Sequence, residues 1–335
     1  LGGLPMEPGG PTALEAAETP NLDALAREGI CGLHEPIGPG VTPGSGPSHL
    51  ALFGYDPLRH DVGRGALAAL GVGFDLGPHD VAARGNFCTV DKDLIVLDRR
   101  AGRISTEQCA ALCDLLRERV QLANVTCFIQ PVRDYRFLLV LRGNGLSGDV
   151  EDTDPQMVGE QVLEPKASSS AGKRTARLVA DFVRQAREAL ADRQPANMLL
   201  LRGFARKPNW PTIEDLYGVR GAAIAGYPMY RGLARLLGMD VLETGSEPAE
   251  EFDVLERHWA DYDLFFVHVK PTDAAGEDGD WARKKERIAE VDALVPRLRA
   301  LQPDVVVVTG DHSTPALLKA HSWHPVPVLL WSPHC

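Results

Sequence analysis

The sequence has 335 residues, of which 44% are hydrophobic and 24% charged, and its formal net charge is −11 at pH 7. This length suits two domains, and the acidic balance argues against a broad nucleic-acid-binding surface. The longest apolar runs, such as 264–267 and 305–308, are far shorter than the roughly 18 residues that cross a bilayer, so we expect no membrane association. Six cysteines without CxxC spacing and no visible secretory leader favour a reduced, cytoplasmic protein.

Glycine and proline crowd two early segments, 1–11 and 36–47, which predicts loops there. Between them, Thr19-Pro20 opens a helix that ends near Gly29. Short apolar runs then alternate with amphipathic segments; the predicted strands are Phe137–Leu141, Met198–Leu201, Ala222–Ala225, Leu264–Val269, Val305–Val308 and Val326–Leu330. Because strands that are apolar throughout are typical of sheets buried on both faces, we predict an α/β fold with a mainly parallel sheet flanked by helices. A helix over Trp281–Leu301 would supply one crossover.

Residues with metal-binding or nucleophilic side chains gather near the two ends of the chain, whereas the middle is rich in arginine-bearing strands and turns. We therefore predict a core made of 1–76 and 209–335, with 77–208 inserted as a smaller α/β domain. The segment Arg206–Thr212 would be the linker that returns to the core.

Asp311 and His312 come two residues after the apolar run 305–308, and ligand sites of open α/β sheets form beyond the carboxyl ends of strands. A carboxylate and an imidazole suit Mn²⁺ or Zn²⁺, although solvated polar residues in a turn would give the same pattern. His321 and His324 follow about a dozen residues later, and either could be a ligand or a loop histidine.

Asp273 and Glu277 follow the apolar run 264–269 and are four positions apart, so on a helix they would share a face and could hold a divalent ion. An acidic helix N-terminus is the alternative interpretation. Ser45 and Ser48 lie where a Gly/Pro-rich loop enters a helix, a position that attracts phosphate; either could be a nucleophile or a helix cap.

These segments resemble, in the same order and over essentially the whole chain, the archaeal-type cofactor-independent phosphoglycerate mutases. The matching segments are Thr19–Ala26, Pro43–Ser45, His49–Pro57, Asn86–Asp91, Asp98–Ile104, Val267–Lys270, Thr309–Pro315, His321–Ser322 and Pro325–Pro327. The resemblance implies an alkaline-phosphatase-like core, an inserted substrate-handling domain, two divalent metal ions and a serine that becomes phosphorylated. Mn²⁺ is the favoured metal, with Mg²⁺, Zn²⁺ or Co²⁺ as alternatives, and no 2,3-bisphosphoglycerate is needed.

By position, the resemblance implies that Ser45 is the nucleophile and, with Asp311 and His312, holds one ion. Asp273, position 277 and His321 match the ligands of the other ion, and His324 matches none. The predicted ligands of a phosphoglycerate substrate, chosen for bidentate arginine geometry and proton transfer, are Asp98, Arg99, Arg100, Arg103, Arg136 and Arg202.

Three features depart from the family pattern. The family begins with an apolar strand and Asp-Gly-Leu-Gly, whose Asp is a metal ligand, whereas this sequence begins at Leu1, so we expect the natural start to lie upstream. Glu277 replaces a histidine, and Gly46-Pro47 follows the serine in place of Asp-Thr-like residues, where a rigid proline could displace Ser45. A different phosphotransfer enzyme (a phosphatase, another phosphomutase or a kinase-like relative) and a non-catalytic binding protein on the same fold therefore stay open. The sequence does not indicate the oligomeric state.

Overall fold

The computed structural model describes residues 1–60 and 62–334, which fall into two compact units. One unit comprises Leu1–Asp61 with Pro211–Cys335, and the other comprises Val62–Trp210. The second unit starts earlier than the predicted 77 because helix α3 (Arg64–Gly71) packs directly on strand β2 (Asp80–Val90). A Cβ on Gly65 would lie only 2.2 Å from the carbonyl oxygen of Ala82, so the helix backbone touches the strand.

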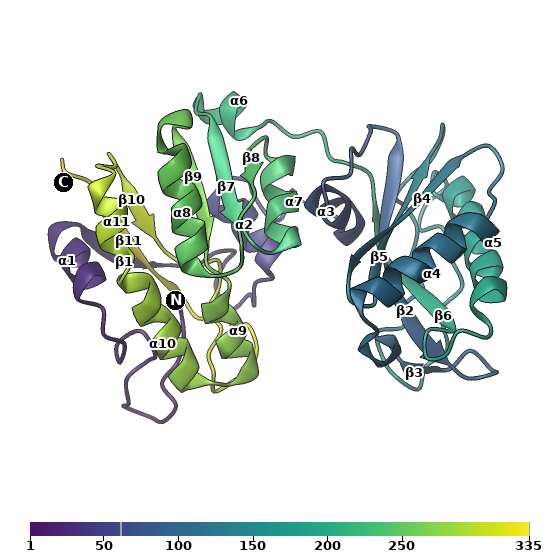
Figure 1. The fold of residues 1–335 in the computed structure, drawn as a ribbon, viewed down its shortest axis with the longest axis horizontal. Helices are drawn as coiled ribbons and strands as arrows, with labels where there is room; N and C mark the ends of the chain where they lie inside the picture. Colours follow the sequence, from purple (N-terminus) through teal and green to yellow (C-terminus); the bar gives the residue numbers. More distant parts are fainter. Residues whose placement is uncertain (61, 335) are drawn as a thin grey trace. The chain divides into compact units, whose positions relative to one another are not determined.

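The first unit, called the core unit below, alternates helices and strands (Figure 1). Its helices and strands are α1 (Pro20–Glu28), β1 (Ile30–His34), α2 (Ser45–Leu52), α6 (Ile213–Tyr217), β7 (Gly221–Ala225), α7 (Pro228–Leu236), β8 (Asp240–Leu242), α8 (Pro248–His258), β9 (Leu264–His268), α9 (Pro271–Asp278), α10 (Trp281–Asp292), α11 (Val295–Ala300), β10 (Val306–Val308) and β11 (Val326–Trp331). The predicted helix after Thr19 is confirmed as α1, with Pro20 in its first turn.

The strands of the core unit form two separate three-stranded sheets among the described residues. The sheet ordered β8-β7-β9 is parallel, whereas the sheet ordered β1-β11-β10 is antiparallel. The prediction of a mainly parallel sheet is therefore wrong for the second sheet. The prediction failed because an apolar run indicates burial and not strand direction. Even the expected burial is incomplete, since Val307 is 57% exposed.

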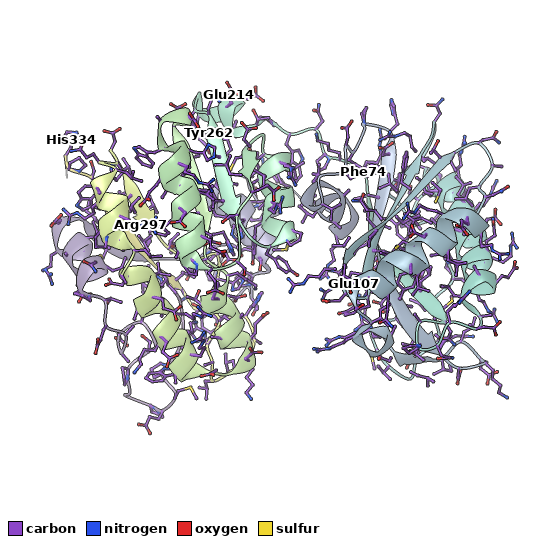
Figure 2. The ribbon with its side chains drawn as sticks, viewed as in Figure 1. Phe74, Glu107, Glu214, Tyr262, Arg297 and His334 are labelled. Atoms are coloured by element: carbon purple, nitrogen blue, oxygen red, sulfur yellow. The ribbon has the colours of Figure 1, made fainter. Side chains whose placement is uncertain are left out.

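The predicted crossover helix is also corrected. It consists of two helices, α10 and α11, which join β9 to β10, and these two strands lie in different sheets. Figure 2 labels Arg297 of α11, whose guanidinium donates to Glu256 (2.6 and 2.7 Å) and to Asp253 (2.7 Å), both on α8. Helices α8 and α11 are thus joined by an ion pair in which one arginine contacts two carboxylates.

The second unit, called the arginine-bearing unit below, is built on one antiparallel sheet. Besides α3 and β2 it contains β3 (Val96–Asp98), a 3₁₀ turn (Ala101–Arg103), α4 (Thr106–Arg119), β4 (Thr126–Arg133), β5 (Arg136–Arg142), α5 (Lys173–Leu190) and β6 (Met198–Ala205). The sheet order is β3-β2-β5-β4, with β6 also paired to β2. Side chains such as Phe87, Phe137 and Phe182 form a buried core between the sheet and α4 and α5, and α3 packs on β2 and β6.

The expected α/β class is confirmed in its coarse form, a mixed α/β protein. All six predicted strands are present, five of them within one residue of their expected ends, whereas the strand predicted over Met198–Leu201 continues to Ala205. No helix in the described part of the chain is long and apolar enough to span a bilayer.

Candidate active site

Ser45 is the first residue of α2, preceded by the extended Gly44 (φ −91°, ψ 154°). The sequence prediction that this serine stands at a helix N-terminus is confirmed. Its Oγ lies 3.0 Å from Nε2 of His312, so the hydroxyl is directed at an imidazole rather than at solvent or at its own helix.

Ser48, the alternative nucleophile, lies one turn further and is fully buried. Its hydroxyl donates to the carbonyl oxygen of Gly44 at 2.9 Å, the bond a helical serine makes with the preceding turn. Pro47 stands in the first turn of α2, where a missing N–H costs the helix nothing, and Ser45 begins the helix. The geometry therefore favours Ser45 over Ser48.

Asp311 and His312 follow β10, as predicted, and both are largely buried. Oδ2 of Asp311 lies 3.1 Å from Nε2 of His312 and 3.4 Å from Nδ1 of His49. Burial opposes the ionisation of Asp311, but the hydrogen bond from His312 and the charges of His49 and His312 outweigh it and hold the pKa of this carboxyl well below its ordinary value. Asp311 is therefore a carboxylate at neutral pH.

Asp273 and Glu277 lie on α9, one turn apart, as predicted. Burial raises the pKa of Asp273, but the ammonium group of Lys270, which contacts Oδ2, lowers it by more. The pKa of Asp273 is therefore below its ordinary value. Glu277 is 48% exposed, and its Oε1 lies 3.5 Å from Nε2 of His321. The ring of His321 stacks on that of His312 with centroids 3.6 Å apart.

Three of these side chains could share a cation. Ligand atoms of Asp273, His312 and His321 lie within 4.8 Å of one another, the only such group found in the described residues. Two imidazoles and an ionised carboxylate are donors that suit Mn²⁺ or Zn²⁺. Glu277 stands outside this group, so its role as a ligand stays a prediction. His324 bonds the hydroxyl of Ser322 at 3.1 Å and stacks on Trp323, away from the ligand group.

Behind Ser45 lies a layer of buried aromatic side chains. His49 donates from Nδ1 to the carbonyl oxygen of Ser45 at 2.7 Å, and its ring lies 4.9 Å from that of Tyr230. Tyr230 stacks on His268 with ring centroids 3.6 Å apart. Burial lowers the pKa of His268 to about 3, so this ring is neutral. Through His49, which contacts both Ser45 and Tyr230, this layer holds the start of α2 in place.

In the arginine-bearing unit, two predicted substrate ligands converge on one buried carboxylate. Arg99 donates from Nε and Nη2 to Asp154 at 3.0 and 2.7 Å, and Nη1 of Arg202 lies 3.5 Å from the same residue. Arg202 also approaches Asp152 at 3.6 Å. On the sheet, Arg202 is paired in register with Arg84, and Asn86 with Arg136, so all four side chains emerge on the same face.

The remaining predicted substrate ligands do not join that cluster. Oδ1 and Oδ2 of Asp98 accept from the backbone N–H groups of Arg100 and Gly102 at 2.8 and 2.6 Å, which gives Asp98 a turn-forming role. Arg100 and Arg103 are exposed. Their roles as substrate ligands stay predictions.

Sequence reasoning overlooked five residues of these clusters. Lys270, Thr314 and Lys284 contact or lie next to the predicted ligands, Tyr230 lies under Ser45, and Asp154 anchors the arginines. Only Lys270 and Thr314 had a usable signal, because both fall inside segments that matched the family. The others are brought in by distant parts of the chain.

A mixed α/β unit that places a serine at a helix N-terminus beside histidines and ionised carboxylates has the residue types of a metal-assisted phosphotransfer or hydrolytic enzyme. Residues 26–197 match the family model described as 2,3-bisphosphoglycerate-independent phosphoglycerate mutase. A probable enzyme of that name from Thermus thermophilus is 52% identical over 338 residues, covering 100% of this chain and 83% of the relative. One from Aquifex aeolicus is 48% identical, covering 100% and 84%.

Solved structures agree with this match. A protein from Pyrococcus horikoshii superposes with a TM-score of 0.83 at 30% identity, covering 99% of this chain and 85% of the other. The cofactor-independent phosphoglycerate mutase of Thermoplasma acidophilum has a TM-score of 0.69 at 29% identity, covering 97% and 84%. The chain belongs to the 2,3-bisphosphoglycerate-independent phosphoglycerate mutase family, a family of isomerases, and the resemblance predicted from its motifs is confirmed.

Proposed function

We propose that this protein interconverts 3-phosphoglycerate and 2-phosphoglycerate through a phosphate carried on Ser45, with two divalent metal ions and without 2,3-bisphosphoglycerate. The observation that carries the proposal is the Ser45 hydroxyl, 3.0 Å from Nε2 of His312 and beside the carboxylate of Asp311. The names of the relatives support the same substrate and the same independence from the bisphosphate. A glycolytic role in the cytoplasm follows from this activity.

We assign Ser45, Asp311 and His312 to one ion, and Asp273, Glu277 and His321 to the other. Mn²⁺ is favoured because the donors are mixed nitrogen and oxygen, with Mg²⁺, Zn²⁺ or Co²⁺ as alternatives. When bound, such ions lower the pKa of a coordinated hydroxyl and neutralise charge on a phosphoryl group. The low pKa values of Asp311 and Asp273 support the assignment, since both carboxylates are ionised before any ion arrives.

In the reaction, Ser45 Oγ gives up its proton and forms a bond to phosphorus while the bond from phosphorus to the glycerate oxygen breaks, and the released oxygen takes up a proton. The other glycerate hydroxyl then gives up its proton as its oxygen attacks the same phosphorus, the bond from phosphorus to Ser45 Oγ breaks, and Ser45 takes up a proton again. The N-terminus of α2 favours the negative charge of the phosphate throughout, because its first backbone N–H groups point outward along the helix axis.

In the arginine-bearing unit, we propose that the side chains gathered around the buried carboxylate of Asp154 bind the carboxylate and phosphate oxygens of the glycerate. Arg99 is held in a bidentate pair with Asp154, which fixes its plane and leaves its remaining N–H groups for an anion. Arg202, Arg136, Arg100, Arg103 and Asp98 are the other candidates.

The test is turnover of 3-phosphoglycerate by the chelator-treated protein before and after addition of Mn²⁺, with no bisphosphate present. We expect 2-phosphoglycerate only after Mn²⁺ is restored. Release of free phosphate would replace the proposal by a phosphatase activity, and the absence of both products at every metal concentration would favour a non-catalytic role. Turnover that chelation leaves unchanged would refute the metal assignment.

A further inference from the structure

Lys284 of α10 is a buried lysine that hydrogen-bonds to the backbone on either side of the predicted metal site. The residue is 2% exposed, and its Nζ donates to the carbonyl oxygens of Thr314 and Gly2, both at 2.8 Å. Burial lowers the pKa of Lys284 from 10.5 to about 8, because a charge is less stable in the protein interior than in water. An apolar side chain would fill this space without that cost, so stability alone does not account for a lysine here.

The backbone that Lys284 holds belongs to the segment that begins with the predicted ligands Asp311 and His312. The N–H of Thr314 donates to the carbonyl oxygen of Gly2 at 3.2 Å, the same oxygen that accepts from Lys284. The ammonium group therefore closes a ring of hydrogen bonds through both backbone groups of Thr314. This ring fixes the chain two residues after His312.

The other end of the Lys284 side chain is anchored to the helix pair that carries Asp273. Helix α9 ends at Gly279, which has left-handed backbone geometry (φ 78°), and α10 begins two residues later, so the two helices meet at a short corner. A Cβ on Gly276 of α9 would lie only 2.3 Å from the carbonyl oxygen of Thr314. The helix pair thus touches the held segment at this carbonyl group, and Lys284 supplies the hydrogen bond there.

We propose that Lys284 is a positioning residue that sets the spacing between Asp273 on α9 and the ligands Asp311 and His312 after β10. The inference rests on the proposed function for the identity of the ligands, whereas the hydrogen bonds do not depend on it. Within the described residues, the hydrogen bonds of Lys284 go to two backbone carbonyl groups and not to a predicted ligand. Lys284 therefore acts through the backbone of Thr314.

This role predicts an effect on metal binding that is opposite in sign to the effect of the charge itself. The charges of Lys284 and Asp273 interact, so the ammonium group repels a cation held by Asp273. Removal of the charge alone would therefore strengthen Mn²⁺ binding. Removal of a positioning residue weakens it, because the ligands no longer keep the spacing that the ion requires.

The experiment compares Lys284→Met, which removes the ammonium group and keeps an unbranched apolar side chain, with the wild type and two controls. Lys319→Met removes an exposed lysine beside the end of α9, where a Cβ on Gly279 would lie 2.4 Å from Cε of Lys319. Ile288→Val trims a side chain that is 1% exposed on the same helix as Lys284, and so controls for a loss of stability. Urea unfolding measures the stability of each variant.

The first readout is Mn²⁺ affinity by dye competition at pH 7, which we expect to fall about tenfold or more in Lys284→Met and to change less than about threefold in both controls. The second readout is hydrogen exchange of the metal-free protein, followed at the amide of Thr314 by mass spectrometry of peptides within 311–322. Exchange should be about tenfold faster or more in Lys284→Met and within about threefold of the wild type in both controls, because a loop amide exchanges by local opening and not by global unfolding.

Unchanged or stronger Mn²⁺ binding in a folded Lys284→Met protein would overturn the inference, and so would unchanged exchange at Thr314. A loss of affinity that Ile288→Val shares would also overturn it, because the loss would then follow from stability. If Lys284→Met does not fold, as judged by circular dichroism, Lys284→Gln decides by the same criteria, since its amide N–H groups stop one atom short of the Nζ position. If the wild type binds no Mn²⁺, the metal assignment of the proposed function fails, and the exchange readout alone decides whether Lys284 holds this segment.

Discussion

Glu251 offers the sharpest test of the electrostatics of the core unit. It lies on α8, is 1% exposed, and its Oε2 has no hydrogen-bond partner among the described residues. Burial, followed by the nearby charges of Glu247 and Glu250, raises the pKa of this carboxyl from 4.5 to about 8, against a small opposing effect of a hydrogen bond from the backbone of Gly226. Glu251 is therefore protonated in the folded protein at neutral pH.

The sign of the pH dependence follows from linkage. A folded-state pKa above the unfolded value means that the folded protein binds more protons between pH 4.5 and pH 8, so stability is lost as the pH rises through this window. Each pH unit in the window costs about 1.4 kcal/mol, which gives roughly 3–5 kcal/mol by pH 8. Glu251→Gln has no proton to lose and escapes this cost.

We expect Glu251→Gln to gain stability relative to the wild type as the pH is raised from 5 to 8.5, with a difference near zero at pH 5. Urea unfolding followed by tryptophan fluorescence measures it, because four of the five tryptophans, Trp259, Trp281, Trp323 and Trp331, lie in the core unit. Glu118→Gln, on an exposed position of α4, is the control and should show no such trend. A Glu251→Gln difference that stays flat with pH would refute the reasoning.

Other predictions concern the site. Ser45→Ala should abolish phosphoglycerate turnover while costing at most about 1 kcal/mol of stability, whereas Ser48→Ala should keep turnover. Mass spectrometry of the 41–50 peptide checks which serine carries phosphate, and a phosphate on Ser48 would contradict the assignment. Glu277→Ala should weaken Mn²⁺ binding and Glu277→His should preserve or strengthen it, measured by dye competition; equal affinities would place residue 277 outside the coordination sphere. Asp154→Asn should raise the KM for 3-phosphoglycerate by releasing Arg99 from its bidentate pair, and an unchanged KM would argue against the arginine cluster as the anion site.

Several features could be predicted from the sequence because they are local. The α/β class, the six apolar strands and the helix after Thr19 follow from residue spacing over short windows, and the structure contains them all. Ser45, Asp311 and His312 were found because strand ends and helix starts collect reactive side chains in these folds, and because contiguous motifs matched a family that the comparisons confirm.

Strand direction and the limits of the second unit were not recoverable in the same way. The antiparallel pairing of β1, β11 and β10 depends on which strands meet, and apolar runs do not encode that. Strand β2, the longest strand among the described residues, was missed because Arg84, Gly85 and Asn86 interrupt its apolar pattern. Helix α3 joined the second unit through the close approach of Gly65 to the sheet, a contact made only after folding.

The residues that hold the site in shape were decided by the tertiary structure alone. The hydroxyl of Thr314 reaches Asp273 across 41 positions of sequence, and Lys284 reaches the carbonyl oxygen of Gly2 across 282. Both separations are far longer than the short windows over which composition and periodicity are read, so neither signal could indicate these contacts. The sequence by itself determined which chemical groups are available; their distances, protonation and partners exist only once the chain has folded and buried them together.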